Sequence, residues 1–190
     1  VLNHAHFNAI TARVTARPGE VLILPVARTS ARSAVYKPLV SKSELNAISS
    51  FIQALASPFV KITVMNALYE EVKVVADVTG TPAVKDRIYY ENLLIEDVNR
   101  FLSPWAYDGS AEPAFGGTIY QSALLDFIEE LPYVDFVSSL QLHHAGSPTL
   151  QEATATSPAS ILMAAPVHDI HMNQGNTNNF STPVAPLNIG

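Results

Sequence analysis

Twice in this chain a proline ends a helical pattern of apolar residues and an alternating strand pattern follows at once. Residues 45–55 carry apolar side chains at helical spacing, Pro58 follows, and residues 59–65 then alternate. The same order recurs over residues 124–142 around Pro132. A period that switches from 3.6 to 2 within one segment excludes an all-helical chain and an all-strand chain. The chain is predicted to be α+β, with duplication and coincidence both open as explanations of the repeat.

The order of these patterns divides the chain into four parts. Residues 21–80 and 81–172 are expected to form two small modules, each with a helix on an antiparallel sheet. An N-terminal arm, 1–20, precedes them, and a tail without periodicity, 173–190, is expected to be extended or disordered. The start at Val1 favours a processed product or the ordered piece of a longer protein.

The first module has a clear strand and a clear helix start. Residues 21–26 read as a short buried strand, and Pro25 places it near an edge or an end of a sheet. Ser41 and Glu44 have the spacing of a capping box, so we expect a helix to begin there.

Two antiparallel hairpins and one further helix start are also predicted. Residues 59–65 are expected to pair with 72–78, and 161–164 with 167–172, since short alternating runs separated by turn residues usually form hairpins. Thr81 is the expected N-cap of the second module's first helix, because Pro82 suits a first helical turn. Residues 143–158 read as a linker.

Composition narrows the classes of function. The 190 residues carry a net charge of −6, with only 15% charged residues, and contain no cysteine. A nucleic-acid binder needs clustered Lys and Arg, so that class is not expected. No apolar stretch approaches the roughly 20 residues of a membrane span, so no membrane insertion is expected. A surface poor in charge is instead suited to protein contact.

The six histidines do not form a predicted metal site. His143 and His144 are adjacent and point to opposite faces of a strand, and His168 and His171 are split in the same way. His4 and His6 share a face but lie in the N-terminal arm. The sequence also lacks a nucleophile elbow, a P-loop and a dinucleotide fingerprint. We therefore expect no catalytic set, metal or cofactor.

The block from residue 101 to residue 120 is the predicted interaction site. It ends a helix at a proline, carries the single Trp of the chain and continues to a glycine pair. Interfaces are enriched in such aromatic residues, although capping the open end of a module would use them too. The candidate docking residues are Phe101, Pro104, Trp105, Tyr107, Phe115, Gly116, Gly117 and Tyr120.

This block is where the chain resembles a known family. Asn-Arg-Phe-Leu-Ser-Pro-Trp at 99–105, then Phe-Gly-Gly-Thr-Ile-Tyr-Gln-Ser at 115–122 and Tyr-Val-Asp-Phe-Val at 133–137 are similar to the C-terminal part of baseplate J-like proteins. The segments 59–74 and 161–170 fit the strands of the same family, so that the resemblance spans roughly residues 21–172. The longer N-terminal part of that family is absent, and the Asn-rich tail is not in its pattern.

The resemblance implies structural work without a cofactor or active site. Baseplate J-like proteins are wedge components of contractile phage tails and related injection systems. As implied partners, we expect other wedge subunits, a second copy or a paralogue, and indirectly the sheath and hub. A sixfold ring of wedges around the hub would help to hold or trigger the sheath. Assembly is expected in the bacterial cytoplasm, with release of the particle from the cell as a further option.

Two hypotheses from other functional classes stay open. A small metal-dependent or hydrolytic enzyme would use His143, His144, His168 or Asp135. An adhesin-like secreted binding module would be a stable monomer. The hypothesis of a docking protein instead places the functional residues in the block 101–120.

Overall fold

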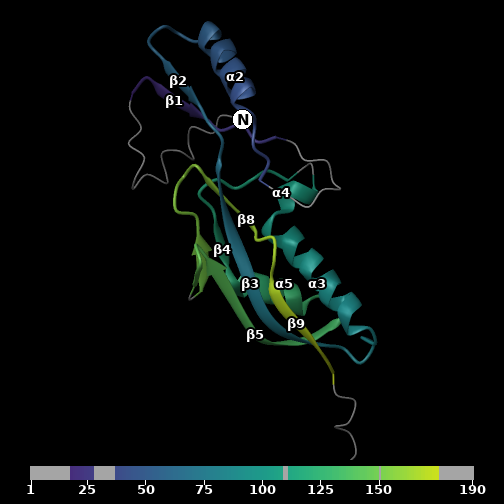
Figure 1. The fold of residues 1–190 in the computed structure, drawn as a ribbon. Coiled ribbons are helices and arrows are strands. Elements are labelled where there is room, and N and C mark those ends of the chain that lie inside the picture. Colours follow the sequence, from purple (N-terminus) through teal and green to yellow (C-terminus); the bar gives the residue numbers. More distant parts are fainter. Residues whose placement is uncertain (1–17, 28–36, 109–110, 150, 176–190) are drawn as a thin grey trace, which may run out of the picture.

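The computed structural model describes residues 18–27, 37–108, 111–149 and 151–175. It confirms the predicted α+β class, with helices packed on open sheets (Figure 1). The helices are α2 (Lys42–Leu55), α3 (Arg87–Leu102), α4 (Pro104–Tyr107) and α5 (Gln121–Glu129). The strands are β1 (Glu20–Ile23), β2 (Lys61–Val64), β3 (Leu68–Gly80), β4 (Thr118–Tyr120), β5 (Val134–His144), β6 (Ser147–Pro148), β7 (Glu152–Thr154), β8 (Ser160–Ala164) and β9 (Asp169–Gln174).

A five-stranded sheet forms the main body of the protein. Its order is β6-β5-β3-β8, and β9 also pairs with β3. β5 runs antiparallel to β3, and the register between them shifts by one residue at two places, after Asp77 and after Thr79. β8 and β9 run parallel to β3 along its other side. α3 and α5 cover one face, where the apolar side chains of alternate β3 residues are fully buried (Figure 1). The core lies between this sheet face and these two helices.

Both predicted hairpins are wrong. β2 pairs in parallel with β1, and β3 joins the main sheet instead of folding back on β2. β8 and β9 do not pair with each other, because both lie in line along β3. The local alternation of apolar residues determines which face of a strand is apolar, but it does not determine which strand pairs with it. In this protein the paired strands are distant in the sequence.

The pairing also crosses the predicted module boundary at residue 80. β3 lies before this boundary and forms the centre of the sheet whose other strands lie after it. The division of the chain into two domains stays a prediction, but the two segments share one sheet. The segment 143–158, read as a linker, contains β6 and β7, and β7 pairs with β4 in a small separate sheet.

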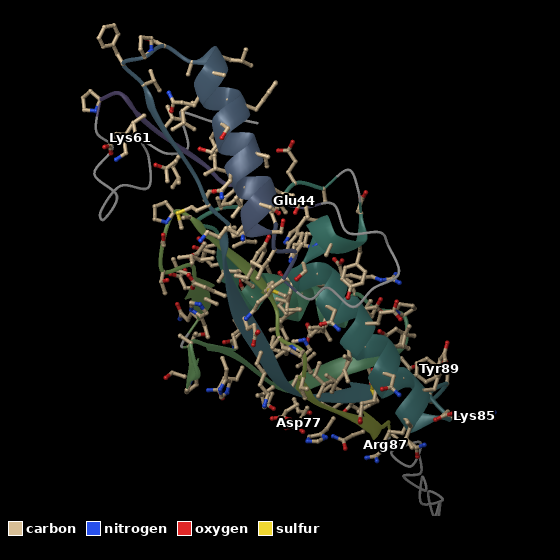
Figure 2. All side chains as sticks on the ribbon, turned by 45° about the horizontal axis from the view of Figure 1, so that its top comes forward. Glu44, Lys61, Asp77, Lys85, Arg87 and Tyr89 are labelled. Atoms are coloured by element: carbon tan, nitrogen blue, oxygen red, sulfur yellow. The ribbon has the colours of Figure 1, made fainter. Side chains whose placement is uncertain are left out.

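A small unit projects from the main body (Figure 1). It consists of α2 on the two-stranded parallel sheet β1–β2. The predicted capping box is confirmed, since the Ser41 hydroxyl accepts the Glu44 N–H and the Glu44 carboxylate accepts the Ser41 N–H. α2 nevertheless has no buried residue. Figure 2 shows Glu44 and Lys61 in this unit, far from Asp77 at the other end of the protein.

The predicted start of the next helix is wrong by several residues. α3 begins after Asp86, whose carboxylate accepts the N–H of Tyr89 at 3.1 Å. Thr81 instead begins a turn, because its carbonyl accepts the N–H of Val84 at 2.9 Å. Asp is as good an N-cap as Thr, so local preference could not choose between the two positions.

Candidate docking surface

α3 lies along the outer edge of β8 and β9 and bonds to it through side chains. The Ser103 hydroxyl at the helix end accepts the backbone N–H of Ala164 at 2.8 Å. The Glu91 carboxylate, three turns earlier, accepts the N–H of Met172 at 3.1 Å. An exposed strand edge is a template for pairing with other chains, and these side chains occupy two of its donors. This edge of the main sheet is therefore closed by the chain itself.

His168 fills the break between β8 and β9. Two residues of β3, Lys73 and Val74, face the four residues 165–168, so the backbone ladder is interrupted. The imidazole Nδ1 accepts the Val74 N–H at 2.9 Å, and Nε2 lies 2.9 Å from Asn99 Oδ1 on α3. Because Nδ1 accepts, the proton is on Nε2, which donates to Asn99. The side chain replaces the missing backbone acceptor.

This arrangement requires a neutral imidazole. Burial, with a smaller contribution from Lys73, lowers the pKa of His168 from 6.5 to about 4. Protonation of Nδ1 would remove the acceptor that Val74 uses and place a charge in the interior. His168 is thus a structural side chain that joins the sheet to α3.

The chain turns round the β8 edge directly after α3. Ser103 is 1% exposed at this turn, and Pro104 is the first residue of the short helix α4. Trp105 then packs on Ile161 and Met163 of β8, whereas α3 covers Leu162 on the other face. Successive residues of a strand point to opposite faces, so α4 lies across the edge from α3.

Trp105 is an internal packing residue. It is 9% exposed, and its ring lies 6.0 Å from the ring of Tyr69. The same cluster includes Ala67, from the segment that connects β2 to β3, and Val26, which follows β1 in the small unit. Among the described residues, Trp105 Nε1 has no hydrogen-bond partner. Burial also raises the pKa of Tyr69 to about 12. The cluster fills the junction between the two parts of the protein.

The glycine pair places the following segment against β8. Phe115 forms an isolated antiparallel bridge with Ile161, and the Gly116 N–H donates to the Ser160 carbonyl at 2.8 Å. Gly116 has a φ of +62°, which other residues rarely adopt. Gly117, next to it, is partly buried. The predicted turn that needs a positive φ is therefore present, with Gly116 as the residue that adopts it.

The other aromatic residues of the block differ in exposure. Phe101 packs on Phe127 of α5 with ring centroids 4.9 Å apart, and both are partly buried against the main core. The Arg100 guanidinium lies 5.8 Å from the Tyr107 ring centroid. Burial raises the pKa of Tyr107, with a smaller effect from Glu96. Tyr120 is 53% exposed, so it is the most exposed aromatic residue of the block. A docking role for the eight predicted residues stays a prediction.

The residues of the enzymatic alternative do not converge. His144 Nε2 lies 2.7 Å from a Glu70 carboxylate oxygen, while the adjacent His143 points to the other face of β5. His168 is held within the sheet, and Asp135 is exposed at the opposite end of β5. No site forms from these four side chains. His4 and His6 lie outside the described residues.

A cleft of about 950 Å³ lies beside the start of β3. Its charged walls are paired, since Lys37 bonds to Glu71 at 2.9 Å and Glu70 to His144. Lys73 likewise bonds to Asp169. Within the part of the chain that is described, no group of three or more potential ligands is arranged for a metal ion. The described helices also include none that is long and apolar enough to cross a membrane.

A model of the baseplate protein PVC11-like family matches residues 2–162. The chain belongs to this family. This match confirms a baseplate protein and a phage-tail-like structural class, whereas the specific baseplate J-like assignment from the sequence stays a prediction. No curated protein matches the chain in sequence.

The fold of this PVC11-like protein also occurs in a solved baseplate. A chain in the cryo-EM structure of the anti-feeding prophage (AFP) baseplate, 6-fold symmetrised, matches with a TM-score of 0.56 and 21% sequence identity. The match covers 76% of this chain and 29% of the other. The PVC11-like protein therefore spans under a third of the chain that it resembles.

Sequence reasoning missed the residues that close the sheet edge. Glu91, Asn99 and Ser103 lie eight and four residues apart, so they share one helix face, and all three bond to β8, β9 or the segment between them. Their polar stripe at multiples of four was visible in the sequence. Its meaning depended on which strand lay beside the helix.

Proposed function

We propose that this chain is a structural component of the baseplate of a phage-tail-like contractile injection particle. The observation that carries the proposal is the family match over residues 2–162 of 190. The fold similarity to a chain of the AFP baseplate supports it. Its partners would then be other baseplate proteins.

In its finer form, the proposal places the chain in the wedges that surround the hub in a sixfold ring. There it would help to hold the sheath extended until contraction begins. Two parts joined by a packed junction suit such a role, because contacts made by the small unit are transmitted through the Trp105 cluster to the main sheet. Assembly would take place in the bacterial cytoplasm, before release of the particle.

Imaging of the particle tests this assignment. A tagged copy of the chain is expressed with the remaining particle genes, and purified particles are imaged with a label on the tag. Labels should form a ring at one end of the tube, and particles made without the chain should lack that ring. Labels along the tube, or complete baseplates without the chain, would contradict the proposal.

A pair of matched variants tests the 101–120 block as a docking surface. Tyr120 and Phe136 are exposed aromatic residues, at 53% and 49%, and Phe136 lies outside the block. Tyr120→Ala should reduce incorporation into particles about tenfold, while Phe136→Ala should leave it unchanged. Incorporation is measured by quantitative immunoblotting of purified particles. Equal incorporation of the two variants would remove Tyr120 from the docking surface.

A further inference from the structure

We infer that the outer edge of β1 is an interface for a second copy of this chain. The two strands would pair antiparallel about a twofold axis near Leu22. The resulting sheet would have four strands, in the order β2-β1-β1-β2. This inference does not rest on the proposed function, because it concerns the association of the isolated chain.

Among the described residues, the backbone groups along one side of β1 have no partner. The carbonyls of Gly19 and Ile23 accept the N–H groups of Lys61 and Met65 at 2.7 and 3.1 Å, so these carbonyls face β2. Backbone groups alternate in direction along a strand. The N–H and C=O groups of residues 20, 22 and 24 therefore point away from β2. Within the described residues no hydrogen bond satisfies them.

The two outer edges of this small sheet differ sharply. On β2, Gln53 of α2 occupies the edge, because its amide oxygen accepts the Ile62 N–H at 3.2 Å and its amide nitrogen donates to the Val60 carbonyl at 2.9 Å. In the described ranges, no corresponding side chain bonds to the outer edge of β1. α2 packs on β2, and Gln53 places it on the side away from β1. The space beside β1 is thus left to a partner.

The sequence of β1 is that of a strand with covered faces. Val21 to Leu24 are all apolar, a pattern typical of parallel strands that are buried on both faces. In the structure these residues are only half-buried, in a sheet of two strands. Isolated two-stranded sheets are marginally stable in water. A neighbouring strand would supply the missing burial.

The β1 edge is complementary to itself. In an antiparallel pair centred on Leu22, residue 20 faces residue 24 of the second copy and Val21 faces Ile23. Apolar side chains then meet apolar side chains, and the single charge of the strand, Glu20, faces Leu24. Glu20 keeps its ion pair with Lys61 at 3.5 Å. Pro25 lacks an N–H, but its nitrogen lies on the β2 side and the new pairing does not need it.

A backbone variant tests this interface in the full 190-residue chain. Leu22→Pro removes an N–H that has no acceptor among the described residues of the single chain and that would bond to the partner in the dimer. Leu22→Val is the matched control, because it keeps the N–H and an apolar side chain. Wild type and Leu22→Val should sediment as concentration-dependent dimers. Leu22→Pro should raise the dissociation constant about 30-fold, since each dimer loses two hydrogen bonds worth about fivefold each.

Hydrogen exchange on wild type gives an independent readout if Leu22→Pro does not fold. The Leu22 amide should exchange at least about tenfold more slowly at concentrations where the dimer forms than in the dilute monomer. A wild-type chain that stays monomeric up to about 1 mM overturns the inference. So does a dimer in which the Leu22 amide is not protected. Neither result bears on the ring position of the chain in particles, which the imaging experiment measures.

Discussion

The two sheets of this protein treat their exposed edges in opposite ways. In the main sheet, the edge of β8 and β9 is closed by Glu91, Asn99 and Ser103 of α3. In the small sheet, Gln53 closes the β2 edge, while no described residue bonds to the outer edge of β1. The main sheet also contains fully buried residues, whereas α2 has none. A part that is closed and packed can fold alone, while a part that is open and half-buried is suited to a partner.

Truncating one leucine in the main body and one in the small unit should give the largest difference in the loss of unfolding free energy between the two parts. Leu94 of α3 is fully buried, so Leu94→Ala should lower the free energy of unfolding by about 3 kcal/mol. Leu45 of α2 is only half-buried, and Leu45→Ala should cost about 1 kcal/mol or less. Urea unfolding measures both values. Equal losses would show that the small unit is as tightly packed as the main body.

Acid should weaken the main sheet through His168. Its pKa is about 4 in the folded chain and 6.5 when unfolded, so between these values only the unfolded chain binds the proton. Stability is therefore retained above pH 6.5 and falls as the pH drops from 6.5 to 4, by about 3 kcal/mol in total. Urea unfolding at several pH values measures the slope. His168→Gln should flatten it, and an unchanged slope in that variant would assign the effect elsewhere.

Removing the hydroxyl of Ser103 should reopen part of the closed edge. Ser103→Ala leaves the Ala164 N–H without its acceptor, which should cost about 2 kcal/mol. Exposed Ser50 on α2 serves as the control, and Ser50→Ala should change stability by less than about 0.5 kcal/mol. Thermal melts measure both. A loss as small as that of the control would mean that solvent replaces the hydroxyl.

Loss of the α2 cap should have the smallest and most local effect. Ser41→Ala removes the acceptor of the Glu44 N–H, a change worth about 1 kcal/mol in other helices. Because α2 is half-buried, we expect faster hydrogen exchange within residues 42–55 and little change in β3. Mass spectrometry of peptides after exchange resolves the two segments. Faster exchange in both would show that the small unit and the main sheet unfold together.

Local chemistry made some features readable from the sequence. The Ser41–Glu44 capping box, the helix stop before Pro104 and the positive φ at the glycine pair each depend on a few neighbouring residues. The family resemblance pointed correctly to a baseplate protein. The sequence also predicted that His143 and His144 lie on opposite faces of a strand, because adjacent residues of a strand point in opposite directions.

Other features depended on which segments meet in space. The alternating pattern of residues 72–78 predicted a strand but not its position at the centre of the main sheet. His168 was considered as a ligand, yet the break between β8 and β9 makes it a backbone acceptor. The sequence predicts a docking role for Trp105, which stays a prediction, and its packing against Ile161 within the chain became visible only in the tertiary structure.

By itself, the sequence determined the α+β class, the period of each element and the low surface charge, because these follow from side chains and their near neighbours. Only the tertiary structure decided the order of the strands, which sheet edges are covered by side chains, and how deeply each aromatic residue is buried. Apolar alternation specifies that a face must be buried without naming the segment that buries it. That choice is made when the whole chain packs, and at β1 the described residues supply a neighbouring strand on one side, β2.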